Sequence, residues 1–355
     1  MNEVDELQKL LQATPEGYRD AIARAAITAA QKTMREELAE LPDAPLLTLL
    51  SADDLLTTDW PEPVWAVPEL LPAGLAILAG KSKIGKSWLA LQLAQAVGAG
   101  GKFFGRDIEQ GPVLYMALED SPRRLRDRMD KQGWPAGLPV DFLTLGSFMQ
   151  EVGDLKDGGG ERVARQIERQ RYRLVIVDTL SRAVCGDQSD VDIMTRALSP
   201  VQETALSLNC ATMMTDHHNK RGGFGTNPDA VGDILGSTAK GALADCIWGL
   251  YRERSKAKAK LCVLGRDVLE QNLALKWDWL TASWQCEGDA DELDMTDRRQ
   301  EIVDALESLG RASLKEIADT VGQPQSNTHT RLQDLAADGK IKRVEEGRRV
   351  FYEPG

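Results

Sequence analysis

The sequence is poor in cysteine and histidine and contains no long apolar run. Its five cysteines are scattered with no C-x-x-C pair, and there are three histidines, so a zinc site or a disulfide framework has little support. No apolar run approaches the roughly 20 residues of a membrane span, and we expect no membrane partner. The N-terminal residues MNEVDELQKLL are acidic and lack the cationic start of a signal peptide. We therefore expect a cytoplasmic protein.

The charge balance is acidic, with a net charge of −12 at neutral pH. An acidic chain is not an obvious nucleic-acid binder, because affinity for DNA depends largely on neutralising phosphates. The basic residues nevertheless cluster, at Arg123-Arg124, at 252–260 and at 340–349. A ring-shaped enzyme needs positive charge only along its inner surface, so the total charge weakens a DNA-binding role without excluding it. The length of 355 residues predicts two or three domains.

Alternating strand and helix patterns in the middle of the sequence predict a parallel sheet covered on both faces. The expected strands are 75–79, 112–118, 142–145, 174–177 and 211–215, and the expected helices are 88–97, 122–132 and 161–171. Further strand patterns at 246–251, 260–264, 273–277 and 283–286 predict an antiparallel extension. Ligands of such sheets bind at the carboxyl ends of the parallel strands.

Two smaller units flank this core. Residues 1–45 carry a polar, alanine-rich helical pattern that predicts an N-terminal helical arm, and a proline-containing linker leads into a core at 46–287. A polar, acidic stretch at 287–297 precedes the third unit, 296–355. Its helical patterns at 298–309, 314–321 and 325–338 and a hairpin at 340–344 and 348–352 predict a winged helix-turn-helix.

The segment Gly80–Ser87 reads G-x-x-x-x-G-K-S, the pattern of a phosphate-binding loop, between an expected strand and an expected helix. Backbone N–H groups of such a loop and the helix N-terminus point at the phosphates. Lys86 is expected to reach the β- and γ-phosphates and Ser87 to ligate Mg²⁺. The alternative is a glycine-rich turn with a solvated lysine. The residues expected at the nucleotide are Gly80, Lys81, Ser82, Lys83, Ile84, Gly85, Lys86, Ser87 and Trp88.

Three further candidates follow apolar strands, at the active edge of the predicted sheet. Asp178 suits a second Mg²⁺ anchor, or else the cap of the next segment. Glu119 suits a general base that polarises the attacking water, or else a structural carboxylate. His217, in the run 216–220, suits a group that touches the γ-phosphate and reports hydrolysis to the following loop, or else one of a surface histidine pair.

Basic residues near flexible segments are the candidate DNA contacts. The glycine-rich segment 220–236 holds Lys220 and Arg221, which suit single-stranded DNA or an ordinary solvated loop. Arg254 lies in a hairpin turn that could contact DNA, contact a neighbouring subunit or simply be solvated. In the third unit the recognition helix is weakly cationic and the wing carries Lys340 and Arg348, so DNA binding and protein docking stay equally open.

Taken in order, these motifs resemble the RecA-like ATPases of the plasmid RepA and DnaB-type hexameric helicase group, over residues 46 to 285. The resemblance rests on the phosphate loop, the strand-end Glu119 and Asp178, the 217–220 motif, the entry motif Leu70-Leu71-Pro72-Ala73-Gly74, Gly236-Ser237 and Leu264-Gly265-Arg266-Asp267. It implies an α/β RecA-like P-loop core, ATP and Mg²⁺ at a subunit interface, a homo-oligomeric ring that is often hexameric, and motion on single-stranded DNA.

By position, the resemblance makes Lys86, Ser87 and Asp178 the ATP–Mg²⁺ ligands, Glu119 the catalytic glutamate and His217 the sensor. It makes Arg266 an arginine finger that acts on a neighbour's nucleotide; the alternative is a salt bridge with Asp267. DnaB-type enzymes carry a lysine two residues before the finger, where this sequence has Leu264. The chain also lacks a recognisable primase-interacting or zinc domain.

The sequence thus leads to an ATP-driven DNA helicase or translocase for replication of a plasmid, phage or integrated element. A nucleotide-gated DNA-binding or loading factor without unwinding is the first alternative, favoured by Leu264 and the winged helix. A regulator whose winged helix recognises duplex DNA is another. A small-molecule kinase is least favoured, because no arginine-rich lid segment is present.

Overall fold

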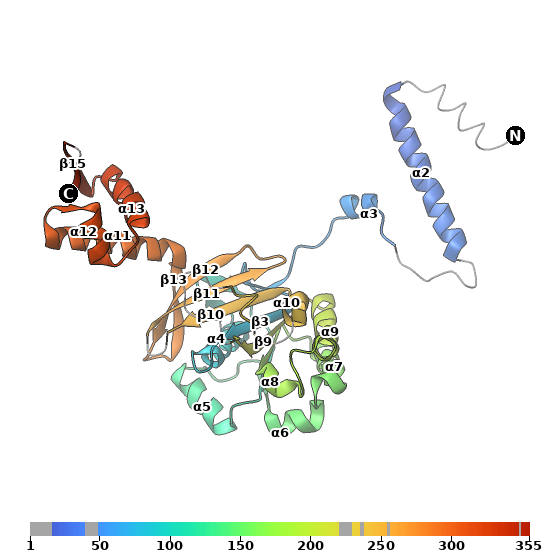
Figure 1. Ribbon diagram of the computed structural model, residues 1–355. Helices are drawn as coiled ribbons and strands as arrows, with labels where there is room; N and C mark the ends of the chain where they lie inside the picture. Colours follow the sequence, from blue (N-terminus) through green and yellow to red (C-terminus); the bar gives the residue numbers. More distant parts are fainter. Residues whose placement is uncertain (1–15, 40–48, 220–228, 235–237, 254–255, 348) are drawn as a thin grey trace. The chain divides into compact units, whose positions relative to one another are not determined.

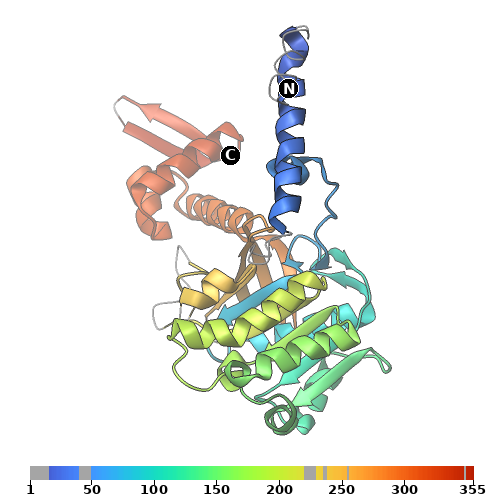
Figure 2. The same ribbon diagram turned by 90° about the vertical axis from the view of Figure 1, so that its right-hand side faces the viewer.

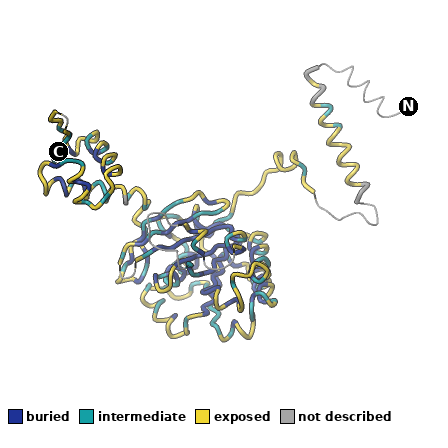
Figure 3. The backbone as a smooth tube through the Cα atoms, in the orientation of Figure 1, coloured by how far each residue is buried: buried dark blue, intermediate teal, exposed yellow. Residues whose placement is uncertain are grey.

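The structure is a computed structural model that describes residues 16–39, 49–219, 229–234, 238–253, 256–347 and 349–355. The chain divides into two compact units, Met1–Glu62 and Pro63–Gly355. The first contains the helices α2, Glu16–Ala39, and α3, Ala52–Thr57 (Figure 1). Residues of α2 are mostly exposed (Figure 3). Over the described residues, none of the helices combines the length and apolar character needed to cross a bilayer.

A nine-stranded sheet forms the centre of the second unit, in the order β13-β12-β11-β10-β3-β9-β8-β6-β7. Every neighbouring pair from β10 to β7 is parallel, and β10 to β13 are successively antiparallel. This confirms the predicted α/β P-loop core with an antiparallel extension. The strands are β3 Gly74–Gly80, β6 Val113–Ala117, β7 Val140–Thr144, β8 Leu174–Asp178, β9 Ala211–His217, β10 Cys246–Arg252, β11 Lys258–Gly265, β12 Gln271–Asp278 and β13 Ser283–Asp289.

Helices cover both faces of this sheet, as predicted from its uninterrupted apolar strands. Figure 2 shows α7 and α9 packed side by side on one face. The longer helices are α4 Lys86–Ala99, α5 Pro122–Lys131, α7 Gly159–Gln170 and α9 Val191–Ser207; the short ones are α6 Leu145–Ser147, η1 Phe148–Val152, η2 Leu155–Asp157, α8 Leu180–Ala183 and α10 Thr238–Leu243. Two small hairpins complete the unit, β1 Trp65–Val67 with β2 Leu71–Pro72 and β4 Gly101–Phe103 with β5 Arg106–Ile108.

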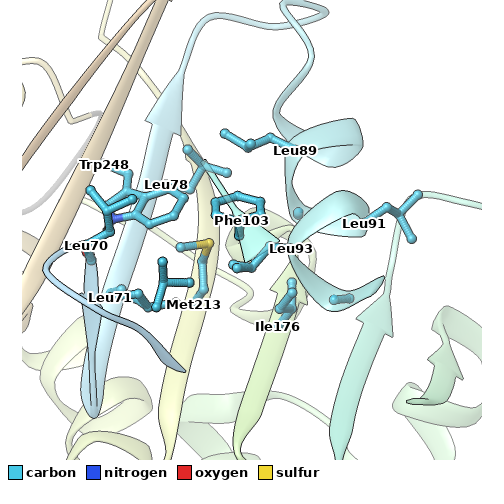
Figure 4. Close-up of a cluster of buried hydrophobic side chains, with 14 of the residues drawn as sticks. Leu70, Leu71, Leu78, Leu89, Leu91, Leu93, Phe103, Ile176, Met213 and Trp248 are labelled. Carbon is cyan, nitrogen blue, oxygen red and sulfur yellow. The ribbon is translucent and has the colours of Figure 1, made fainter. Parts of the chain in front are cut away.

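Successive residues of a strand point to opposite faces, and this alternation divides the core in two. On β3, Leu78 packs with Leu89 and Leu93 of α4 and with Trp248 (Figure 4). Leu75 belongs instead to the cluster formed with α7 and α9. The phosphate-loop strand is therefore anchored from both sides, which fixes the position of the loop that follows it.

Helix α9 is absent from the sequence-based expectation. Its buried residues Met194, Ala197, Leu198 and Val201 follow the spacing i, i+3, i+4, i+7 of an amphipathic helix. Pro200 lies inside the helix, where proline removes a backbone donor and normally argues against a helix. Burial against the sheet outweighs that local preference.

The last part of the chain contains the predicted three helices and hairpin. They are α11 Ala290–Leu309, α12 Leu314–Val321, α13 Gln325–Ala337, β15 Ile341–Glu346 and β16 Arg349–Pro354, with an additional short strand, β14 Ala312–Ser313, beside β16. The acidic stretch 287–297, expected to separate the third unit from the core, is itself part of a strand and a helix. Residues up to Asp289 continue β13, and the Asp289 side chain caps α11 by accepting from the backbone N–H groups of Asp291 and Glu292.

Candidate nucleotide-binding site

The loop between β3 and α4 needs glycine at both glycine positions of its G-x-x-x-x-G-K-S pattern. A Cβ on Gly80 would lie 2.7 Å from Ile84 Cδ1 and 2.9 Å from the Leu250 carbonyl oxygen. Gly85 has a φ of 112°, a conformation that favours glycine, and a Cβ there would lie 2.8 Å from Trp284 Cζ2. The tight loop ends where α4 begins, so its backbone and the N-terminal turn of α4 face one cavity.

Lys86 is buried, and its ammonium group lies against the loop itself. Nζ donates to the carbonyl oxygens of Gly80, at 2.7 Å, and Lys81, at 3.0 Å. Burial lowers the pKa of Lys86 to about 8, against the opposing effect of Asp178, Asp216 and Glu119. The alternative of a solvated lysine in a glycine-rich turn is therefore wrong: this lysine is a buried cation at the phosphate loop.

Asp178 ends β8 and is almost fully buried. Its carboxylate accepts from Thr215 Oγ1, at 2.6 Å, and Tyr115 OH, at 2.9 Å. Burial raises the pKa of Asp178, while hydrogen bonds from Thr215, Ser87 and Tyr115 oppose that rise. The alternative role as a helix cap is wrong, because Thr179 is the N-cap residue of α8.

The oxygen atoms of Ser87 and Asp178 fit a magnesium ion, which binds proteins through one or two such groups and completes its shell with phosphates and water. The Ser87 hydroxyl is among the groups that lower the pKa of Asp178. Over the described part of the chain there is no cluster of three or more His, Cys, Asp or Glu that could hold a metal by itself. The residues present therefore suit a metal that arrives with phosphate oxygens.

Glu119 and His217 lie at the same edge of the sheet. Glu119 follows β6, and its Oε1 accepts from Thr179 Oγ1 at 3.2 Å; that hydroxyl lies 2.8 Å from Ser181 Oγ. His217 ends β9, with Nδ1 3.4 Å from the Ser82 hydroxyl of the loop. Burial and the nearby Lys86 lower the pKa of His217.

A cavity of about 730 Å³ lies at this edge of the sheet. It brings together the predicted loop residues 82–88, Glu119 and His217, whereas Gly80, Lys81 and Asp178 are not among the residues that line it. The lining also includes Arg128, Thr179, Arg252, Trp277 and Trp279, which the sequence analysis did not assign to the site. Arg252 and the tryptophans come from the antiparallel extension, more than 160 residues after the loop, and no local motif marks them.

A buried ion pair supports the strand that carries His217. Lys240 of α10 donates from Nζ to Asp216 Oδ2 at 2.7 Å, and both side chains are at most 1% exposed. Asp216 Oδ1 also accepts from the His217 backbone N–H at 2.8 Å, and Lys240 donates to Gln188 Oε1 at 2.9 Å. The pair therefore ties the end of β9 to α10. His218 is also buried, 7% exposed, so the alternative of a surface histidine pair is wrong.

Replacing Lys240 with methionine is expected to lower the free energy of unfolding by about 3–5 kcal/mol, because a buried charge loses its partner. Urea denaturation measures the change. The double variant Asp216→Asn/Lys240→Met is expected to be less destabilised than the sum of its single variants. Lys102→Met is the control, since Lys102 and Asp107 form an exposed ion pair that contributes about 0–1 kcal/mol. Equal effects of the two lysine variants would contradict this prediction.

Arg266 is not part of this cavity. Its NH1 lies 2.7 Å from Asp245 Oδ1, and NH2 donates to the Ala242 carbonyl. Asp245 also accepts from the Leu75 backbone N–H near the start of β3, whereas the phosphate loop follows the end of that strand. The salt bridge is therefore with Asp245, not with Asp267. Arg266 does not reach its own subunit's phosphate loop, and its side chain is 57% exposed.

Most predicted DNA contacts lie outside the described residues: Lys220, Arg221, Arg254 and Arg348. Lys340 is exposed, just before β15. Within the wing, Arg343 lies 2.6 Å from Glu345, and Arg311 contacts both Glu346 and Glu353. Acidic neighbours thus partly neutralise Arg311 and Arg343.

The chain is similar to two protein-family models and to a solved structure. A family model described as an AAA domain matches residues 35–223, more than half of the chain, and includes the phosphate loop, Glu119, Asp178 and His217. A second family model, described as HVO_A0114, matches residues 294–353. Among solved structures, the KaiC-like protein PH0186 from the hyperthermophilic archaeon Pyrococcus horikoshii OT3 is similar, with 15% sequence identity and a TM-score of 0.43; the match covers 63% of this chain and 98% of that one.

Proposed function

The chain belongs to the AAA domain family. From this premise we propose that it hydrolyses ATP with Mg²⁺ and uses the free energy of hydrolysis to act on DNA. One observation supports the hydrolytic part above all others. A buried lysine of the phosphate loop and a glutamate after β6 line the cavity, and the buried Asp178 at the end of β8 is near enough to interact electrostatically with that lysine. This is the set of groups that phosphoryl transfer needs to bind, neutralise and attack a triphosphate.

In the proposed reaction, Glu119 accepts a proton from water as the water oxygen bonds to the γ-phosphorus. The bond from that phosphorus to the β–γ bridging oxygen breaks, and ADP and phosphate leave. Lys86 turns from the Gly80 and Lys81 carbonyls to the phosphates and stabilises their charge. Ser87 and Asp178 would hold Mg²⁺, which supplies further charge neutralisation when bound. His217, beside Ser82 of the loop, is placed to sense the γ-phosphate.

ATP affinity is expected to fall as the pH rises through about 8, the pKa of Lys86. Bound phosphate favours the charged lysine, so its pKa in the complex is higher than in the free protein. ATP affinity is therefore highest below pH 8. It falls by up to about tenfold per pH unit between the pKa of Lys86 in the free protein and its higher pKa in the complex. Dissociation constants of a fluorescent ATP analogue between about pH 7 and pH 9 measure this effect. A Lys86→Ala protein should lose the dependence, and a wild-type affinity that stays constant over this range would contradict it.

We propose further that the protein is a homo-oligomeric ring, in the simplest case a hexamer, that acts on single-stranded DNA as a helicase or translocase. The support is the sequence resemblance to the RepA and DnaB-type group and the placement of Arg266. That arginine is exposed at the end of β11, remote from its own nucleotide cavity. It is useful to catalysis only if it enters the cavity of a neighbouring subunit.

Phosphate release with Mg²⁺ and ATP, measured with and without single-stranded DNA, tests this proposal. Stimulation by the DNA and displacement of a strand from a forked duplex would support a helicase. Stimulation without displacement selects the nucleotide-gated loading factor. No phosphate release under any of these conditions would overturn the ATPase proposal, and a protein that stays monomeric with ATP and DNA removes the role of Arg266 in trans.

One contact favours duplex DNA as a second ligand, through residues 290–355 acting as a winged helix. The expected recognition helix is weakly cationic because Asp334 lies in α13 and Asp338 is its C-cap residue. Both pair with Arg299 of α11, at 3.2 and 3.8 Å, so their charge is partly neutralised within the domain. The exposed side chains of α13 include Asn327 and Gln333, which suit hydrogen bonds to base edges. Footprinting on duplex DNA would distinguish this role from protein docking.

A further inference from the structure

Two side chains of the antiparallel extension contact the backbone of the phosphate loop. Arg252, the last residue of β10, donates from NH1 to the Ile84 carbonyl oxygen at 3.3 Å. Trp284 of β13 donates from Nε1 to the Gly85 carbonyl oxygen, also at 3.3 Å. The two contacted carbonyls are consecutive, and they belong to the peptide units that end in the N–H groups of Gly85 and Lys86.

Holding these carbonyls also fixes the direction of the N–H groups. A peptide unit is planar and trans, so its N–H points opposite to its C=O. The Gly85 carbonyl is already held by the first hydrogen bond of α4, from the Leu89 N–H at 3.0 Å. Among the hydrogen bonds of the described residues, the Ile84 carbonyl is contacted from outside the loop by Arg252. The orientation of the Gly85 N–H therefore depends on a residue of the extension.

The two donors are themselves held firmly. The Arg252 guanidinium carbon lies 4.9 Å from the ring centroid of Trp284 and 5.6 Å from that of Trp277, and Nε donates to the Lys256 carbonyl at 2.6 Å. Trp284 exchanges two hydrogen bonds of 2.8 Å with the Gln92 side chain of α4 through its backbone. A Cβ on Gly85 would collide with the Trp284 ring, so loop, helix and extension fit together closely.

Arg252 is also placed unlike an ordinary surface arginine. It lines the nucleotide cavity, yet its contacts with other described residues are to carbonyl oxygens and aromatic rings, and no carboxylate of the described chain pairs with it. A guanidinium without a carboxylate partner leaves its positive charge available to an anion. Its charge and its hydrogen bond thus act on the same phosphate site.

We propose that Arg252, supported by Trp284, is a positioning residue that orients the Gly85 N–H of the loop toward the phosphates of the bound nucleotide. This rests on the proposed nucleotide site and adds to it a part of the chain that the phosphate-loop motif does not include. The ligand group recognised is the polyphosphate, not the base. Loss of Arg252 is therefore expected to weaken the binding of any ligand that carries the triphosphate group.

Calorimetric titration with ATP and with inorganic triphosphate, both with Mg²⁺, tests the proposal. Arg252→Met should bind both ligands about tenfold more weakly, the effect of losing one charge-assisted hydrogen bond. Trp284→Phe, which retains an aromatic ring and loses the N–H donor, should show a smaller loss in the same direction for both. Trp60→Phe is the matched control, since Trp60 Nε1 likewise donates to a backbone carbonyl, that of Leu55, but Trp60 is not among the residues that line the cavity; its triphosphate affinity should equal that of the wild type.

The changes in affinity for ATP and for inorganic triphosphate, compared with each other, decide whether the proposal holds. If Arg252→Met lowers the affinity for ATP and leaves the affinity for inorganic triphosphate unchanged, Arg252 contacts the base, and the proposal is overturned. Unchanged affinity for both ligands in a folded Arg252→Met protein also overturns it. Should that variant fail to fold, Trp284→Phe with unchanged triphosphate affinity has the same consequence. A wild-type protein that binds neither ligand would instead overturn the proposed function, and this inference with it.

Discussion

Replacing Lys86 with alanine is expected to lower the rate of ATP hydrolysis by at least about 100-fold, the loss typical of removing one transition-state donor. Two effects combine. The cavity loses a buried ammonium group that would neutralise the phosphates, and the Gly80 and Lys81 carbonyls lose the donor that holds them. Phosphate release at saturating ATP measures the rate, and titration with ATP should show weaker binding as well.

The control for this variant is Lys102→Ala. Lys102 lies on the β4–β5 hairpin, is 69% exposed in its side chain and pairs with Asp107, and it is not among the residues that line the cavity. Its rate should match that of the wild type. Full turnover by the Lys86→Ala protein would refute the proposed site, because no other described lysine donates to the loop carbonyls at Gly80 and Lys81.

Glu119→Gln is expected to lower hydrolysis by about 10²–10⁴-fold, the contribution of a general base, while ATP binding is retained. Glutamine keeps the length of the side chain and an oxygen acceptor for the Thr179 hydroxyl, but it cannot accept the proton of the attacking water. Single-turnover phosphate release and ATP titration on the same protein separate the two effects. This separation of binding from turnover distinguishes Glu119 from Lys86.

The same variant tests the alternative that Glu119 is a structural carboxylate. In that case Glu119→Gln would lower the melting temperature and leave the hydrolysis rate per folded molecule unchanged. Glu168→Gln is the matched control, because Glu168 is an exposed residue of α7, the same chemical change outside the cavity. A Glu119→Gln protein that hydrolyses ATP at the wild-type rate would exclude the general-base role.

The sequence by itself determined the phosphate loop, the main strands around it, the longer helices except α9, and the strand-end carboxylates. These features depend on local chemistry. Glycines at two positions permit a tight loop, an apolar run forms a buried strand, and a polar residue after such a strand lies at the carboxyl edge of a parallel sheet. Each can be recognised within a few residues, and the structure confirms that Glu119 and His217 line the cavity formed by the loop, with Asp178 buried behind it.

Only the tertiary structure decided which distant residues complete the site. Arg252 and Trp284 contact the loop because β10 pairs with β3 and because β13 packs on α4. Lys240 meets Asp216, and Arg266 meets Asp245 rather than the adjacent Asp267, for the same kind of reason. The order of strands in a sheet results from packing over the whole core, and contacts that depend on that order leave no periodicity or spacing in the sequence. The physical reason is that a motif encodes its own backbone conformation, whereas its neighbours are selected by the fold.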